Sequence, residues 1–163
     1  LPFMIMSLAA QFGVMELSTG FEWIGYPVAL VLFGTASVIE ILSYYIPWFD
    51  NLLDSITAPL AMVCGTLVMG SAIVEMEPWI KWTLAIIAGG GTAGLIKGTS
   101  TTTRAVSSVT TAGLGNPLVA TIESVSSIGL SLLSIFIPVI AVLVVLGLVI
   151  LILRKFWRLR SSP

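Results

Sequence analysis

SVSSIGLSLLSIFIPVIAVLVVLGLVILIL, which occupies residues 124–153, contains no charged side chain, and a second uncharged stretch covers residues 55–74. A helix that crosses the hydrocarbon core of a bilayer needs about 20 predominantly apolar residues, so each stretch is long enough. Hydrophobic residues make up 57% of the chain and charged residues only 9%, against about 25% charged residues in soluble domains. We therefore expect an all-α polytopic transmembrane helix bundle, one membrane domain over residues 1–163, with the lipid bilayer as its main partner.

The rest of the chain alternates apolar segments with short polar breaks. The expected order is the end of a helix at residues 1–15, a helix at 23–44, an interfacial amphipathic helix at 47–56, spanning helices at 57–74 and 79–97, a broken polar segment at 98–117 and a long helix at 118–156. Pro138 is expected to kink this last helix, whose spanning part is residues 128–153. Gly89, Gly90, Gly91 and Gly94 predict either a tight helix crossing or a break.

Two heptapeptides, GTASVIE at residues 34–40 and GTAGLIK at residues 91–97, are identical at four of seven positions. Trp23 and Trp79 precede the two copies, and a Pro-Leu pair follows each, at residues 59–60 and 117–118. Repeats in transporters often place a binding site between the two copies. A short match can also arise by chance in a chain so rich in Gly, Ala, Ile and Leu. An internal repeat with halves at residues 22–75 and 78–135 is therefore one of two open interpretations.

Glu40 and Lys97 close the two copies with opposite charges. A charged side chain near the centre of a bilayer costs about 2.5 to 3.5 kcal/mol on insertion scales, so it needs a partner or a role. Three interpretations stay open: an intramembrane ion pair between Glu40 and Lys97, separate snorkelling of each side chain to the headgroups, and a site for a transported ion.

The polar segment predicts an anion site. Nine of the thirteen residues 99–111 are Ser or Thr, and Arg104 lies among them. Arg104 and Lys97 would supply charge, hydroxyl donors would come from Thr101, Ser108 and Thr111, and Asn116 would cap a new helix whose free N–H groups point back at the anion. A phosphate-like or halide anion fits this set. The competing interpretation is an exposed polar loop with a solvated cation.

The chain lacks the residues that several kinds of catalytic chemistry require. It has no histidine and a single cysteine, Cys64, so zinc hydrolase and Ser-His-Asp mechanisms are excluded. Asp50 and Asp54 are spaced to share a helix face, but two carboxylates on a surface helix are usually only solvated. We expect no catalytic residue, no metal site, no cofactor and no enzyme activity. The acidic balance outside the C-terminal tail argues against a nucleic-acid partner.

The basic residues of the tail indicate the orientation. Arg154, Lys155, Arg158 and Arg160 gather in the last ten residues. Short basic segments beside a membrane helix stay in the cytoplasm, so we expect a multi-pass protein with a cytoplasmic C-terminus.

Two motifs resemble a known family: IPWFD at residues 46–50 with Asp54, and TAGLGNP at residues 111–117 with Glu123. The chain resembles small bacterial integral-membrane proteins catalogued only as a domain of unknown function. That resemblance implies the bacterial inner membrane and no particular activity. Members usually carry further Gly- and Ala-rich residues before the Leu-Pro seen here at residues 1–2, so we expect an incomplete N-terminus.

Two functions from different classes follow. The first is a transporter or channel for an ion or small anion, indicated by the repeat and the polar segment. The alternative is a non-catalytic structural or accessory subunit of a larger membrane complex, indicated by the small size and the glycine steps. A homo-oligomer or a membrane-complex partner accompanies either function.

Overall fold

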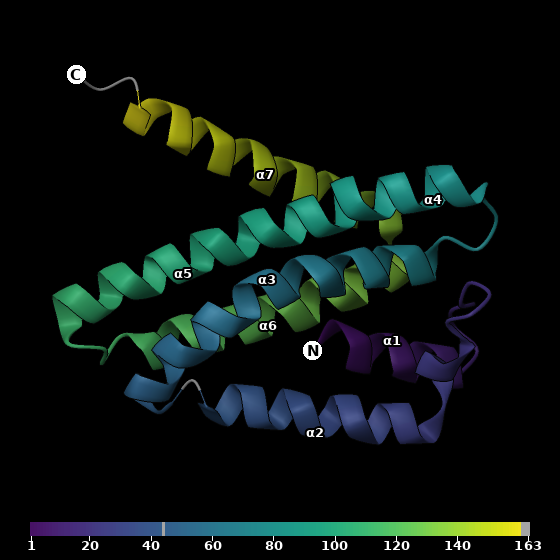
Figure 1. Cartoon of the computed structure of the whole chain (residues 1–163), viewed down its shortest axis with the longest axis horizontal. Helices are drawn as coiled ribbons and strands as arrows, with labels where there is room; N and C mark the ends of the chain where they lie inside the picture. Colours follow the sequence, from purple (N-terminus) through teal and green to yellow (C-terminus); the bar gives the residue numbers. More distant parts are fainter. Residues whose placement is uncertain (44, 161–163) are drawn as a thin grey trace.

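Helices make up the secondary structure of the part of the chain that the computed structural model describes, residues 1–43 and 45–160 (Figure 1). The side chains of residues 47–51, 53, 54, 159 and 160 are outside that description. The elements are α1 Pro2–Gln11, the 3-10 turn η1 Glu22–Gly25, α2 Pro27–Ser43, α3 Pro47–Ala72, α4 Pro78–Leu84, the π-helical turn η2 Ala85–Gly90, α5 Gly91–Thr111, α6 Asn116–Phe136 and α7 Pro138–Arg160. The expected all-α fold is confirmed.

Among the described residues, four helices are long and apolar enough to cross a membrane. They are Ser55–Ala72, Pro78–Thr111, Asn116–Phe136 and Pro138–Arg158. The second of these is the continuous run of α4, η2 and α5. Two shorter apolar helices, α1 and α2, precede them. The chain is therefore a multi-pass membrane protein.

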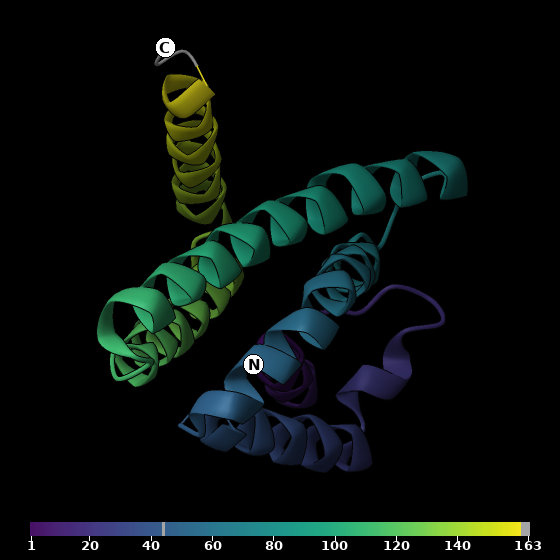
Figure 2. The same ribbon diagram turned by 60° about the vertical axis from the view of Figure 1, so that its left-hand side comes forward.

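The helices run back and forth along one axis (Figure 1). The connections at residues 12–26 and 73–77 and the α6–α7 junction lie at one end, which we call the loop end. The start of α3, the α5–α6 turn and the end of α7 lie at the opposite end, which we call the tail end. Arg104 lies in the second half of α5, toward the tail end. Along the long axis of Figure 1, α7 turns back toward the tail end, while Figure 2 shows that α7 points away from the other helices at a steep angle.

Three sequence-based boundaries differ from the structure. The expected amphipathic helix at 47–56 is not separate, because α3 continues through Pro59 to Ala72. A proline inside a spanning helix removes one backbone hydrogen bond, which neighbouring groups can compensate. The expected long helix at 118–156 is two helices. Ile137 is non-helical, with φ −139° and ψ 68°, because a following proline disfavours the helical conformation.

The third difference concerns the polar segment. It breaks only at residues 112–115, whereas residues 98–111 remain α-helical to Thr111. Ala112 and Gly113 have φ values of 51° and 84°, so the chain turns through the left-handed region there. Glycine accepts this conformation without steric cost, and Gly113 therefore belongs to the turn.

The tightest contact in the bundle joins α3 to η2 and α5. A Cβ atom built on Gly65 would lie 2.5 Å from the carbonyl oxygen of Gly89 and 2.6 Å from the Cβ of Ala93. Helices can approach this closely only where both present small residues. The glycines of residues 89–94 thus form a crossing, and the chain stays helical through it with one π-helical turn.

Hydrogen bonds fasten the loop end. The backbone N–H of Ser18 donates to the carbonyl of Ser71 at 2.9 Å, and Lys81 donates through Nζ to the Ser18 hydroxyl. The same ammonium lies 5.5 Å from the centre of the Phe21 ring. These contacts tie the connection after α1 to the end of α3 and to α4.

Candidate anion site at the tail end

One face of α5 is a polar stripe. At 3.6 residues per turn, its members fall within about 100° of arc. They are Lys97, Ser100, Thr101, Arg104, Ser108 and Thr111. The opposite face is exposed and includes Val109, which is 87% exposed. All the α5 residues expected at the anion site therefore lie on one side of one helix.

Hydroxyl groups off the stripe are satisfied by their own helix. Thr99, Thr102, Thr103 and Thr110 each donate to the carbonyl four residues earlier, at 2.8 to 2.9 Å. A hydroxyl bonded in this way needs no water, so it tolerates a surface of low polarity. These hydroxyl groups are thus accommodated within a continuous helix, where the sequence predicts a broken polar stretch.

Arg104 forms an ion pair across the helix interface. Its Nη2 donates to Oε2 of Glu123 in α6, and the hydroxyl of Ser100 donates to the other carboxylate oxygen, Oε1. Arg104 is 1% exposed and Glu123 is 33% exposed. Buried charges persist when they are paired and hydrogen-bonded, and this carboxylate has two donors from α5.

The depth of this pair follows from its position in α6. Glu123 comes seven residues after Asn116, where α6 begins, so it lies about 10 Å along that helix at about 1.5 Å per residue. The bilayer core is about 30 Å thick. The pair therefore lies inside the bundle and closer to the tail end than to the loop end.

Asn116 does not cap α6, contrary to the sequence-based expectation. The N-cap residue is Gly115, and no side chain bonds there. The amide Nδ2 of Asn116 instead donates to the hydroxyl of Ser108 at 2.9 Å, and its backbone N–H donates to the carbonyl of Gly113 at 3.1 Å. At 1% exposed, Asn116 is a buried bridge between α5 and α6. Thr111 accepts a bond from the N–H of Gly115 at 3.0 Å and so closes the turn.

Two buried hydroxyl groups, one on the stripe and one on the neighbouring helix α3, have unused hydrogen-bonding capacity. The oxygens of Thr57 in α3 and Thr101 in α5 are buried and have no hydrogen-bond partner among the described residues. These two helices pack against each other. A water molecule or a ligand near the stripe could bond to these hydroxyls.

Glu40 and Lys97 are both partly buried and both interact with groups of the protein. Glu40 lies in α2 and Lys97 in α5, with α3 between these helices in both views (Figures 1 and 2). Their expected ion pair stays a prediction. The internal repeat does as well. The first proposed half contains α2 and α3, and the second contains the continuous run from α4 to α5 followed by α6. The two prolines that should correspond differ in position, because Pro59 lies inside α3 whereas Pro117 lies at the start of α6.

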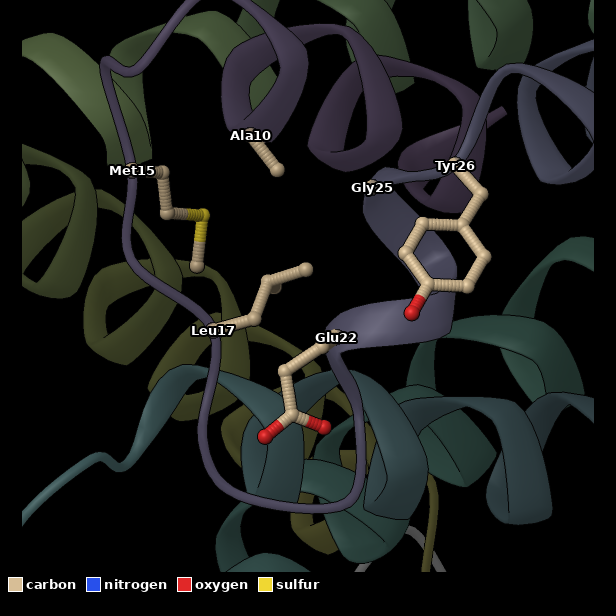
Figure 3. Close-up of a pocket in the computed structure, with 6 residues that line it drawn as sticks. All are labelled: Ala10, Met15, Leu17, Glu22, Gly25 and Tyr26. Carbon is tan, nitrogen blue, oxygen red and sulfur yellow. The ribbon is translucent and has the colours of Figure 1, made fainter.

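A shallow depression of about 260 Å³ lies at the loop end (Figure 3). Its lining comes from α1, the following loop and η1, and comprises Ala10, Met15, Leu17, Glu22, Gly25 and Tyr26. Oε2 of Glu22 accepts a hydrogen bond from the N–H of Gly20 at 2.7 Å, so this carboxylate holds its own loop. The tail end remains the better candidate site, because its charged groups lie buried between helices.

Sequence reasoning missed the partner of Arg104. The sequence places Glu123 in a motif, but the motif does not identify it as the residue that faces Arg104. A signal was present, because α5 and α6 form a hairpin that turns at residues 112–115. Arg104 and Glu123 lie equally far before and after the middle of that turn. Equal distances along the two arms of a hairpin bring residues side by side.

The fold and the polar stripe with its buried Arg104 define an α-helical multi-pass membrane protein with a charged site between its helices. A family model described as "Domain of unknown function (DUF4126)" matches residues 1–158. The chain belongs to this family, which confirms the resemblance in its motifs. Neither the curated proteins nor the solved structures contain a match.

Proposed function

We propose that the protein is a transporter or channel for a small anion, with the polar stripe of α5 as its binding surface. The observation that carries the proposal is Arg104, a guanidinium 1% exposed between two spanning helices. Ionisable residues within spanning helices are rare and commonly mark ion pathways. Thr101 and Ser108 would supply hydroxyl groups along the same stripe, and Lys97 a second positive charge. The hydroxyl of Thr111 is engaged at the turn, because it donates to the carbonyl of Ser107 and accepts from the N–H of Gly115.

We also propose the orientation. Arg154, Lys155 and Arg158 end α7 at the tail end, whereas the loop end has four exposed glutamates, Glu16, Glu22, Glu75 and Glu77. The positive-inside rule then places the tail end in the cytoplasm. In the bacterial inner membrane, Arg104 would be reached from the cytoplasmic side.

Anion flux into proteoliposomes tests this function. The wild-type protein should carry chloride or phosphate, and Arg104→Lys should reduce phosphate flux more than chloride flux, because lysine lacks the planar fork that holds two oxygens. Thr103→Val is the matched control, since Thr103 neighbours Arg104 but is exposed and bonded to its own helix. Equal fluxes with and without the guanidinium would contradict the proposal.

A structural or accessory subunit is the second candidate, and α7 favours it. This helix is apolar around its circumference, with Val139 70% and Leu151 63% exposed, while Ala141 is 5% exposed. Such a surface fits lipid, a second copy or another membrane protein. Purification after mild solubilisation separates the two functions. A stable stoichiometric partner favours the subunit, and Arg104-dependent flux by the protein alone favours transport.

A further inference from the structure

We propose that Glu123 is a built-in occupant of the anion site, and that the site takes a small planar oxyanion, such as a carboxylate or nitrate, when Glu123 leaves it. This inference rests on the proposed function and adds the class of anion and the group that competes with it. The inference is carried by one arrangement, in which a buried guanidinium and a hydroxyl group together hold the two oxygens of one carboxylate.

The bonding of Glu123 indicates the shape of the anion. Oε1 accepts from Ser100 and Oε2 accepts from Arg104, so the two donors are matched to two oxygens of one planar group. An external carboxylate or nitrate presents the same pair of oxygens. A halide is a single sphere, and in this place it could meet only one of the two donors at its best distance.

The two partners differ in how firmly they are held. Arg104 is 1% exposed, whereas Glu123 is 33% exposed and extends from α6 toward α5. Moving the glutamate side chain aside would therefore cost less packing than moving the arginine. The Thr101 hydroxyl, one turn before Arg104 on the stripe, has no hydrogen-bond partner among the described residues and could bind an incoming anion.

Few other charges surround Glu123. On α5 they are Lys97 and Arg104. The helix α1, which packs on α6, has no titratable side chain, and α7 carries its basic residues, Arg154, Lys155, Arg158 and Arg160, at its far end. The helix α3, which packs on α5, carries Asp50 and Asp54 in its first two turns, where the side chains are not described. The hydroxyl of Tyr45 lies 3.1 Å from that of Thr121 in α6.

Removing the charge of Glu123 would weaken its hold on the site. A neutral amide in place of the carboxylate lacks the charge-assisted bond to the guanidinium, so an external anion binds Arg104 with less competition. Losing a charge-assisted bond corresponds to about a tenfold to a hundredfold change in affinity. Glu123→Gln should therefore bind an external anion more strongly than the wild type does.

Nitrate flux into proteoliposomes at neutral pH tests this inference. Glu123→Gln should carry nitrate at least about tenfold faster than the wild type, because the carboxylate no longer competes for the guanidinium. Glu75→Gln is the matched control, because Glu75 is exposed at the loop end.

The outcomes separate the two proposals. If nitrate flux depends on Arg104 but Glu123→Gln is no faster than the wild type at neutral pH, Glu123 does not compete and only this inference fails. If neither the wild type nor Glu123→Gln carries nitrate, chloride or phosphate, the proposed function fails with it. If Glu123→Gln does not fold, Ser100→Ala keeps the ion pair but removes the donor to Oε1. It should lower nitrate flux more than chloride flux, and an equal effect on both anions would overturn the inference.

Discussion

The two ends of the bundle hold their cations differently. At the loop end, Lys81 is half-buried and contacts a hydroxyl and an aromatic ring, so it keeps its net charge while it fastens a loop. At the tail end, Arg104 is buried and its charge is balanced by Glu123. A balanced pair can lie between spanning helices, whereas an unbalanced charge must stay near water. Among the described residues, the charged side chain that is fully buried, Arg104, therefore lies toward the tail end, which is where we place the function.

The largest difference in signal is expected from thiol labelling, which shows which end of the bundle faces the cytoplasm. In a Cys64→Ser background, a cysteine at Glu75 should react with an impermeant thiol reagent added to intact cells. A cysteine at Ser162 should react only after permeabilisation, because the basic tail keeps its end in the cytoplasm. Labelling of Ser162→Cys in intact cells would reverse the assignment of the two ends.

Breaking the buried pair should have the largest effect on stability. Arg104→Gln leaves the Glu123 carboxylate without its cation and should lower the free energy of unfolding by about 3 kcal/mol. The double variant Arg104→Gln/Glu123→Gln should recover most of this loss, because no lone charge remains. Thermal unfolding in detergent measures both. A double variant as unstable as the single one would mean that the pair does not balance charge.

An ion pair between Glu40 and Lys97 would be a second case of two opposite charges that balance each other. If the two side chains touch, Glu40→Gln should destabilise the protein, and adding Lys97→Met should restore much of the loss. The coupling energy from the double-mutant cycle should then be about 0.5 to 3 kcal/mol. Additive effects would show that the two charges have separate partners.

The smallest effect is expected at the loop end. Lys81→Met removes the bond to Ser18 but leaves no buried charge, so the loss should be about 0.5 to 1.5 kcal/mol. The connection at residues 12–26 should become more sensitive to protease, since it loses one of its ties to α4. A loss as large as that of Arg104→Gln would remove the contrast between the two ends.

Composition and periodicity were enough to predict the membrane helices, but prolines misled the placement of their ends. Pro59 follows Ala58 and leaves α3 unbroken, while Pro138 follows the β-branched Ile137 and separates α6 from α7. A residue before proline is already restricted, and β-branching restricts it further. Which proline breaks a helix depends also on the packing around it, and this cannot be found from a local pattern.

For the site, the helical period already places the polar residues of α5 on one stripe. The helical period alone could not identify the residues of α6 that contact this stripe across the α5–α6 interface. Asn116 matches the pattern of a cap, yet its amide nitrogen donates to Ser108, which is within reach because α5 stays helical to Thr111. Glu123 could have been assigned to Arg104 only after the hairpin and its turn were known, because that pairing depends on where α5 ends.

Binding of nitrate to the purified protein tests the central claim most directly. A ligand that binds the folded state raises the melting temperature, and at a fixed ligand concentration the rise is larger for a tighter ligand. At neutral pH, nitrate should raise the melting temperature of Glu123→Gln more than that of the wild type, and it should leave Arg104→Gln/Glu123→Gln unchanged. An equal increase in the protein without the guanidinium would contradict an anion site at Arg104.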